Sequence, residues 1–376
     1  MKIAGVHCRM FPWWAFNVFK DLLQEKIKKN PDWDFKVFTL IADHDFKTLE
    51  IQIPWTNEYK KIPVIEALPK WISTLFLYFS HHQVRFFSSL FNYRNLIVLY
   101  PLLMKILSRK IRIFAPEKIL ISSFAIAKNI TLPKSCNHSE LYLHSPMQYI
   151  WSHYEEYLHK FSWWKQKLFQ WITPRLRNWD KKFTHFDKIY FNSKYTQELA
   201  WELYHLQGEV QYPLIQDTFY FAGISSSPRP YYVFVGRLVS FVRECELIIK
   251  VFNALKLPLL MIGSGPDEWE LKALAGDTVM FLGWLPAEEM KEIVKHAKGL
   301  VNLAKESFGI GTVEALLMGV PVLWFNEWWT KELVDQKSGI LIDTKDEKTL
   351  KQAILQFEQT SFDRKYISEH IRNLLG

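Results

Sequence analysis

The segment 305–323 combines residue types that suit a phosphate site. Gly309 and Gly311 let the backbone approach a ligand closely, and a helix that begins here directs unpaired N–H groups and the positive end of its dipole at that ligand. Glu306 precedes this helix and Glu314 lies within it. Two carboxylates beside a phosphate cradle suit a ligand that carries both phosphates and sugar hydroxyls. A nucleotide sugar meets both demands.

The same segment resembles the donor-site motif of the retaining glycosyltransferases of family 4, in which two glutamates separated by seven residues surround a Phe-Gly-Ile core. The matching positions are Glu306, Phe308, Gly309, Ile310, Glu314, Ala315, Gly319 and Pro321. The resemblance implies that Glu306 acts on the donor sugar as a catalytic residue and that Glu314 holds the ribose, with the Phe-Gly-Ile core and Gly311 also binding the donor. The alternative is an ordinary helix–strand junction with two solvated glutamates.

A second element follows a predicted strand at Gly236 and Arg237, with Arg243 shortly after it. In the resembling family, an Arg and a Lys that follow such a glycine hold the donor diphosphate. At equal spacing the Lys position is Val242 here, and Arg243 comes one residue later. A guanidinium fork can bind phosphate oxygens in pairs, so we expect Gly236 and Arg243 to bind the donor and Arg237 to act in catalysis. The neighbouring carboxylate of Glu244 is a further departure from the family pattern.

Two glycine turns precede the glutamate motif. Gly263 and Gly265 follow one predicted strand, and Gly283 ends the next. A Gly-X-Gly pair alone is typical of a simple turn. In this order, however, the three glycines resemble the elements that flank the nucleotide in the family, and we expect them to bind the donor.

The first half carries a segment, 144–151, that resembles the His-x-Pro-Met-Arg-Tyr-x-Trp element of a mannosyltransferase subgroup. This resemblance implies that His144 is a catalytic residue on the sugar side and that GDP-mannose is the donor; Gln148 replaces the usual Arg. Taken alone, a histidine of this kind is typical of a structural, hydrogen-bonded residue. The glycine-rich turn that the family has after its first strand is replaced by the segment 7–14, which includes Trp13.

These residues follow predicted strands, so a fold that brings the ends of several strands together would place them at one site. The sequence predicts such a fold. Short apolar segments with strand character alternate with longer helical patterns, and this rhythm runs twice along the chain. The predicted strands are 2–6, 35–40, 118–122, 188–192, 232–235, 258–262, 279–282, 299–303 and 321–324. The predicted fold class is α/β, with two doubly wound Rossmann-like domains facing a cleft; the resemblance implies the GT-B arrangement.

The domain boundaries follow from this rhythm. We expect an N-terminal, acceptor-side domain over 1–212 and a C-terminal donor-binding domain over 213–359. The final helix, 360–376, is expected to pack back on the first domain, as in the resembling family. The proline- and serine-rich stretch 221–230 has no periodicity and is predicted to be a linker.

Composition limits the partners and the compartment. The 376 residues carry a formal charge of +8, which favours an anionic partner such as a phosphate or an acidic membrane surface. Three scattered cysteines predict neither a disulfide framework nor a zinc site, and no metal cluster stands out among the 12 histidines. We expect no metal and no cofactor beyond the donor itself. With no signal-peptide pattern at the N-terminus, a cytoplasmic location is expected.

Aromatic residues, including 16 Trp, crowd the first half. The apolar stretches within 71–107 are too short to span a bilayer, and we expect them to be helix faces buried in a core. The segment 161–182 mixes Trp with Lys. Two interpretations stay open for it: a helix in contact with a membrane surface, or a helix buried in the core.

Together with these patterns, the resemblance implies a retaining, metal-independent hexosyltransferase that moves a sugar, with GDP-mannose as donor, onto a hydroxyl of a glycan or a lipid-linked acceptor in polysaccharide biosynthesis. The alternatives are a UDP-sugar-dependent transferase, a nucleotide-sugar epimerase of the same fold, and a degenerate GT-B protein that serves as a membrane-associated scaffold. Nucleic acid is not expected as a partner, because the basic residues form no recognisable binding module.

Overall fold

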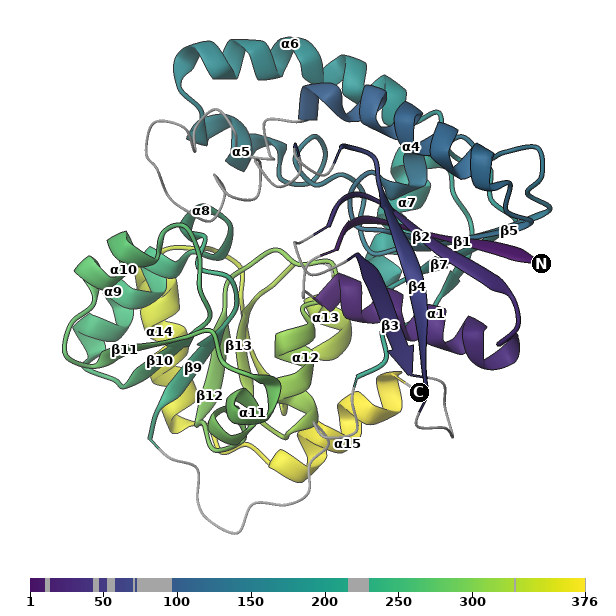
Figure 1. The fold of residues 1–376 in the computed structure, drawn as a ribbon. Helices are drawn as coiled ribbons and strands as arrows, with labels where there is room; N and C mark the ends of the chain where they lie inside the picture. The colour runs from purple at the N-terminus through teal and green to yellow at the C-terminus, as the bar shows by residue number, and fades with distance from the viewer. Residues whose placement is uncertain are drawn as a thin grey trace. The chain divides into compact units, whose positions relative to one another are not determined.

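The chain divides into two compact units, Met1–Leu214 and Ile215–Gly376 (Figure 1). The sequence placed this boundary after residue 212. The computed structural model describes residues 1–10, 14–42, 47–52, 58–69, 72, 97–215, 230–327 and 329–375. Residues 11–13 of the replaced glycine turn, which include Trp13, lie outside the described residues, as do the whole stretch 73–96 and all but the last residue of the predicted linker 221–230.

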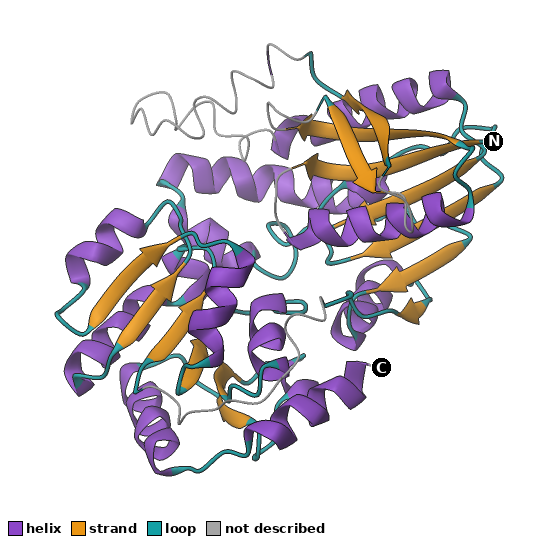
Figure 2. Cartoon of the chain, turned by 60° about the horizontal axis from the view of Figure 1, so that its bottom comes forward, coloured by secondary structure: helices purple, strands orange, loops and turns teal. Residues whose placement is uncertain are grey.

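The first unit is an eight-stranded sheet with helices on both of its faces (Figure 2). The strands are β1 (Lys2–Met10), β2 (Asp34–Ala42), β3 (Thr48–Gln52), β4 (Tyr59–Glu66), β5 (Lys118–Ser123), β6 (His138–Leu143), β7 (Lys188–Phe191) and β8 (Glu209–Val210). The helices are α1 (Trp14–Lys29), α4 (Tyr100–Phe114), the 3₁₀ turn η2 (Ala127–Asn129), α5 (Tyr154–Lys160), α6 (Trp163–Asp180) and α7 (Lys194–Tyr204).

The strand order of this sheet is β3-β4-β2-β1-β5-β6-β7-β8, and β3 is the strand that pairs antiparallel. Strand β1 occupies the interior and is buried from Ile3 to Met10. Such an unbroken buried run is typical of a parallel strand covered on both faces. The four strands predicted in this half are present, and the sequence missed β3, β4, β6 and β8.

The second unit is a six-stranded sheet in which every pairing is parallel. Its strands are β9 (Tyr232–Val235), β10 (Leu259–Ile262), β11 (Val279–Gly283), β12 (Gly299–Asn302), β13 (Val322–Phe325) and β14 (Gly339–Ile342). Its helices are α8 (Ser240–Arg243), α9 (Cys245–Leu255), α10 (Glu268–Leu274), α11 (Ala287–Lys295), α12 (Ile310–Leu317), α13 (Thr330–Leu333), α14 (Glu347–Gln359) and α15 (Arg364–Leu375). All five strands predicted here are present, and β14 was missed.

The last helix, α15, groups with the second unit and packs on α12. Ser368 Oγ donates a hydrogen bond of 2.5 Å to the carbonyl oxygen of Leu317, and Ile367 and Ile371 are fully buried. The expected contact of this helix with the first domain stays a prediction.

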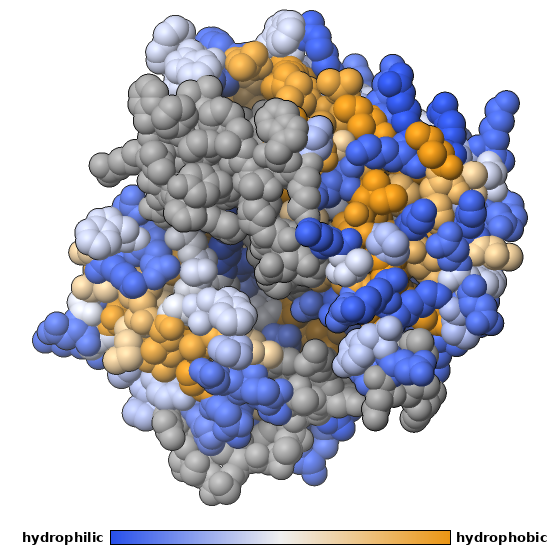
Figure 3. Space-filling model, viewed as in Figure 1, coloured by the Kyte–Doolittle hydropathy of each residue, from blue (hydrophilic) through white to orange (hydrophobic). Residues whose placement is uncertain are grey.

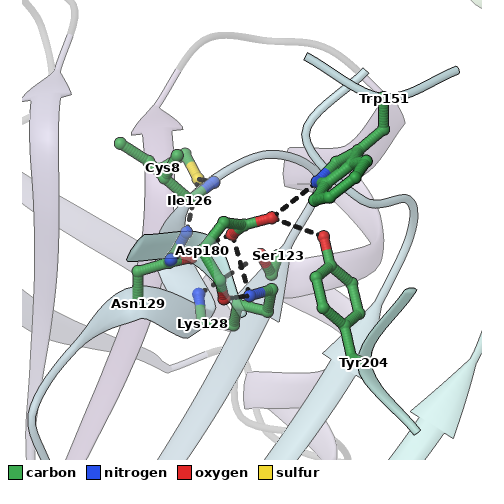
Figure 4. Close-up of polar contacts among 9 residues, drawn as sticks. Cys8, Ser123, Ile126, Lys128, Asn129, Trp151, Asp180 and Tyr204 are labelled. Carbon is green, nitrogen blue, oxygen red and sulfur yellow. Dashed lines mark hydrogen bonds and ion pairs between the residues drawn. The ribbon is translucent and has the colours of Figure 1, made fainter. Parts of the chain in front are cut away.

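A buried ion pair ties together segments of the first unit that are distant in sequence (Figure 4). Lys128 Nζ lies 2.8 Å from Asp180 Oδ1, and both side chains have no exposed surface. Asp180 Oδ2 also accepts hydrogen bonds from Trp151 Nε1 at 2.8 Å and from Tyr204 OH at 2.5 Å. The carboxylate therefore joins η2, the loop before α5, the end of α6 and the end of α7. Saturating its oxygens in this way offsets the cost of burying the charge.

We expect Asp180→Asn to destabilise the first unit by about 3–5 kcal/mol, because the substitution leaves the Lys128 ammonium buried without a counter-charge. Urea unfolding measures this cost. The matched control is Glu140→Gln, which breaks the partly exposed Lys26–Glu140 pair and should cost about 1 kcal/mol or less. Equal costs for the two variants would contradict the role assigned to Asp180.

Candidate functional site

The strand order of the second unit, β11-β10-β9-β12-β13-β14, reverses its direction of growth between β9 and β12. In an open parallel sheet, the loops that leave the carboxyl ends of two such strands run to opposite sides, and ligands bind between them. Gly236 and Arg237 follow β9 directly, and Glu306 and Gly309 lie in the loop after β12. The fold thus brings the two main predicted donor elements to one point.

An ion pair joins these two elements. Arg243 Nη2 lies 2.6 Å from Glu306 Oε1, and both side chains are about one-fifth exposed. The guanidinium lies directly over Gly236, where a Cβ would sit 2.8 Å from Arg243 Nη1. Arg243 therefore reaches the end of β9 although it sits one position later than the family pattern has its Lys. Arg237 is half-buried in the loop after β9.

Helix α12 begins at this point. Gly309 precedes it with φ of +68°, and a Cβ there would lie 2.7 Å from the Trp324 ring and 2.8 Å from Glu306 Oε2. Both the backbone conformation and the space require glycine. The amides of Ile310 and Gly311 have no hydrogen-bond partner among the described residues, so they and the helix dipole are available to an anion. Gly311 also lies close to β9, since its Cβ would be 3.4 Å from Val235 Cγ1.

The glycines after β10 have a structural role that the sequence did not predict. A Cβ at Gly263 would lie 2.0 Å from the carbonyl oxygen of Gly236, and one at Gly265 would lie 2.1 Å from that of Leu238. These glycines allow the loops after β9 and β10 to touch backbone to backbone. Gly283 has φ of +71° with open space at its Cβ position, and its carbonyl accepts a hydrogen bond from Gly263 N. Direct donor contacts of the three glycines stay a prediction.

Two tryptophans that the sequence analysis did not single out fix the loop after β12. Trp329 Nε1 donates a 2.5 Å hydrogen bond to the carbonyl oxygen of Phe308, and the two rings lie 4.9 Å apart. Trp324 Nε1 donates to the carbonyl oxygen of Ala304 at 3.3 Å. The Phe308 side chain is itself buried, so only its backbone could contact a donor. The clustering of Trp at the end of β13 was the available sequence signal.

Asn302 is a further residue that sequence reasoning missed. It ends β12, and its Nδ2 lies 3.1 Å from Glu306 Oε2 and 3.0 Å from Thr312 Oγ1. Its Oδ1 accepts a hydrogen bond from the amide of Ala304. Asn302 is buried, so it fixes the Glu306 carboxylate from the side of the core.

Glu314 differs from Glu306 in its surroundings. The residue is half-buried on α12, and its carboxyl group makes no hydrogen bond or ion pair with the described residues. Burial disfavours the charged form and raises the pKa of Glu314 to about 8. The group is therefore mostly neutral at pH 7, and a neutral carboxyl can donate a hydrogen bond as well as accept one.

The two departures from the family pattern do not disturb the ion pair. Glu244 adopts φ of +53° between α8 and α9, and its Oε1 lies 3.7 Å from Lys345 Nζ. The carboxylate that the sequence placed beside Arg243 thus points to a different cation. Val242 is half-buried in α8.

The predicted catalytic histidine lies in the first unit. His144 follows β6, its ring has no exposed surface, and its Nε2 lies 2.8 Å from Ser122 Oγ. Ser122 Oγ in turn lies 3.0 Å from His7 Nδ1. Burial holds the pKa of His144 well below its usual value and lowers that of His7 to about 3. This placement favours a neutral structural histidine, and a direct catalytic role for His144 stays a prediction.

The second unit matches a known protein family. Residues 229–359 match the family model described as Glycosyl transferases group 1, which covers β9 to α14 and less than half of the chain. A search of curated proteins found no match. The family match supports a sugar transferase, and the family-4 and mannosyltransferase assignments stay predictions.

Solved structures resemble the chain over its whole length. Sucrose-phosphate synthase from Thermosynechococcus elongatus has a TM-score of 0.68 at 14% identity, with 100% of this chain and 95% of that chain covered. WaaG, a glycosyltransferase involved in lipopolysaccharide biosynthesis, scores 0.65 at 12% identity, covering 99% and 95%. Anabaena HepE in complex with UDP scores 0.61 at 16% identity, covering 100% and 94%. At such low identities, structural similarity shows the fold alone. It confirms the predicted GT-B class with two Rossmann-like domains.

We expect the stability difference between Glu314→Gln and the wild type to depend on pH. The folded pKa of Glu314, about 8, exceeds the ordinary value of 4.5, so the folded wild type binds a proton that the unfolded chain has released between these values. Wild-type stability should therefore fall relative to the variant as pH rises from 5 to 8, by at most about 1.4 kcal/mol per pH unit. Urea unfolding of both proteins at pH 5, 6.5 and 8 measures it. A difference that does not change with pH would contradict the raised pKa.

Proposed function

We propose that this chain is a retaining glycosyltransferase that moves a sugar from a nucleotide sugar, with GDP-mannose as the first candidate, onto a hydroxyl of a glycan or lipid-linked acceptor. One observation carries the proposal: Arg243, Glu306 and the start of α12 meet at the carboxyl ends of β9 and β12. This point is where an open parallel sheet binds its ligand. The groups gathered there are those that a diphosphate and a sugar require.

The difficult step of such a reaction is the departure of a nucleoside diphosphate, which leaves negative charge on phosphate oxygens while the sugar gains positive character. Preorganised donors that face the developing charge lower this barrier. We propose that Arg237, Arg243 and the free amides of Ile310 and Gly311 supply that stabilisation. In this proposal the positive charge comes from the protein, so the reaction needs no metal.

The two glutamates have separate roles in this proposal. Glu306, anchored by Asn302, binds hydroxyls of the donor sugar. Glu314 binds the ribose, and its neutral form supports this role because it can both donate to and accept from a diol. No carboxylate is assigned as a covalent nucleophile. Retention is proposed to follow from attack on the same face that the diphosphate leaves.

Donor identity has two candidates. The His144 segment resembles that of mannosyltransferases and favours GDP-mannose. HepE, which shares the fold, has been solved with UDP and with UDP-glucose, and this makes a UDP sugar the alternative. A non-catalytic scaffold is the third possibility, favoured by Val242, Glu244, Gln148 and the replaced glycine turn.

We also propose a peripheral contact with a membrane surface through α6. This helix buries Phe169, Ile172 and Leu176 in the core of the first unit. Its other side exposes Trp163 by 78% and Trp171 by 59%. The buried face agrees with a helix packed in the core, and the exposed tryptophans support the proposed contact with a membrane surface.

Cations accompany these exposed rings. Arg175 lies 4.0 Å from the centroid of the Trp171 ring, and Lys165 lies 5.3 Å from that of Trp164. Lys167 is exposed on the same helix. Trp mixed with Lys and Arg is the composition of helices that lie in a membrane interface.

Helix α4 adds apolar surface to the same unit. Leu102 and Ile113 on this helix are exposed by 54% and 85%, and apolar side chains gather over the region of α4 in Figure 3. The buried face of α4, which includes Leu103 and Leu107, confirms the expectation for the end of the stretch 71–107. Among the described residues, no helix is long and apolar enough to span a bilayer. The three cysteines are free, which is compatible with the cytoplasmic face of a membrane.

The function is tested with a thermal-shift panel of GDP, UDP and their sugar conjugates in the presence of EDTA, followed by transfer assays. A ligand that binds only the folded state raises the unfolding midpoint by mass action. We expect GDP and GDP-mannose to raise it. We also expect Arg237→Ala and Glu306→Ala each to reduce transfer at least about 100-fold, because each removes a group that acts in the transition state.

Both variants should keep the wild-type unfolding midpoint without ligand. A response to UDP species alone would move the donor assignment to UDP sugars. Nucleotide binding with neither transfer nor donor hydrolysis would favour the scaffold. No response to any nucleotide would overturn the proposed function.

For the membrane contact, we expect the double variant Lys165→Gln/Lys167→Gln to bind phosphatidylserine-containing vesicles about tenfold or more weakly than the wild type. Each cation near an anionic surface contributes about 1 kcal/mol. Vesicle co-sedimentation at fixed salt measures it. The control Lys348→Gln/Lys351→Gln makes the same charge change on α14 of the second unit and should bind as the wild type does. Equal binding by both double variants would contradict a contact through α6.

A further inference from the structure

The predicted phosphate ligand Arg243 already has an anionic partner within its own chain. Glu306 Oε1 lies 2.6 Å from Arg243 Nη2. The guanidinium lies over Gly236 at the end of β9, where a donor diphosphate is proposed to bind. Glu306 thus engages the cation that the diphosphate requires, while being itself the residue proposed to bind the donor sugar.

The position of the Glu306 carboxylate also matches that of an anion at a helix N-terminus. Its Oε2 would be 2.8 Å from a Cβ at Gly309, the residue that precedes α12. The free amides of Ile310 and Gly311 follow immediately. A carboxylate between a guanidinium and the positive end of a helix dipole has the same electrostatic surroundings that a phosphate would have there.

The two oxygens of Glu306 are held differently. Oε2 accepts a hydrogen bond from Asn302, which is buried and is fixed in turn by Thr312 and Ala304. Oε1 is held by Arg243, whose side chain is partly exposed. A partly exposed ion pair contributes little net free energy, so a stronger anion can replace one partner. The buried hydrogen bond to Asn302 need not break when this happens.

We propose that Glu306 is an internal occupant of the phosphate site and that the donor diphosphate displaces it from Arg243. Displacement frees Oε1 for a hydroxyl of the donor sugar, while Asn302 keeps the carboxylate in place through Oε2. In this exchange, Arg243 changes its partner from Glu306 to the diphosphate, and Glu306 changes its partner from Arg243 to the sugar hydroxyl. This inference rests on the proposed function and adds how the site is kept closed to solution anions until the donor arrives.

The exchange predicts that removing the Glu306 charge strengthens the binding of a nucleoside diphosphate that carries no transferable sugar. Glu306→Gln keeps an oxygen that can accept from Asn302 but competes weakly for Arg243. We expect this variant to bind UDP or GDP, whichever the wild type binds, about two- to tenfold more tightly by isothermal titration calorimetry. Sugar transfer by the same variant should fall. Arg243→Gln should weaken nucleotide binding.

The double variant Glu306→Gln/Arg243→Gln separates partner exchange from general repulsion. If Glu306 acts by occupying Arg243, adding Glu306→Gln to Arg243→Gln gives no gain in nucleotide binding; a gain would overturn the inference. Glu358→Gln is the matched control, since it breaks the partly exposed Lys298–Glu358 pair elsewhere in the second unit and should leave nucleotide affinity unchanged. A wild type that binds nucleotide with an affinity equal to or tighter than that of Glu306→Gln would overturn the exchange and leave the proposed function intact. If the wild type binds neither nucleotide, the proposed function fails and the exchange fails with it.

Discussion

The reversal of strand order between β9 and β12 is the constraint on which the candidate site depends. Two parallel neighbours whose following helices lie on opposite faces leave their carboxyl ends free of a crossing connection. Glycines at 236, 263 and 265 let the loops after β9 and β10 touch through their backbones. Gly309 likewise admits Glu306 and Trp324 beside the start of α12. Charged side chains can then gather at this point without large groups filling it.

The two units use ion pairs of similar length for different purposes, and burial accounts for the difference. Lys128 and Asp180 are 2.8 Å apart with no exposed surface, and Trp151 and Tyr204 saturate the carboxylate. Such a pair cannot exchange partners without leaving a buried charge unpaired. Arg243 and Glu306 are 2.6 Å apart but partly exposed, so another anion can replace Glu306 at Arg243 at low cost. The first pair fixes structure, whereas the second suits a site that must accept a ligand.

Most of the scaffold could be predicted from the sequence, because the buried parallel strands are short apolar runs. The nine predicted strands are all present. Two of the missed strands have weaker patterns: β6 begins with His138 and Ser139, and β8 has two residues. The glycines were found because a left-handed backbone or a close backbone contact requires glycine. The glutamates were found because they belong to a motif whose residues are close together in the sequence. Asn302, Trp324 and Trp329 were missed, since an amide or an indole carries no local signal of the carbonyl or carboxylate it will meet.

The sequence by itself determined the fold class, the βαβ rhythm and the residue types of the candidate site, because these depend on local periodicity and on residues close together in the chain. Tertiary structure decided which groups meet. Glu306 and Arg243 are 63 positions apart (306 − 243), and the strand order makes them partners. Burial raised the pKa of Glu314 to about 8 and enclosed the ring of His144. Desolvation depends on every neighbour that packs around a group, and no short stretch of sequence contains that information.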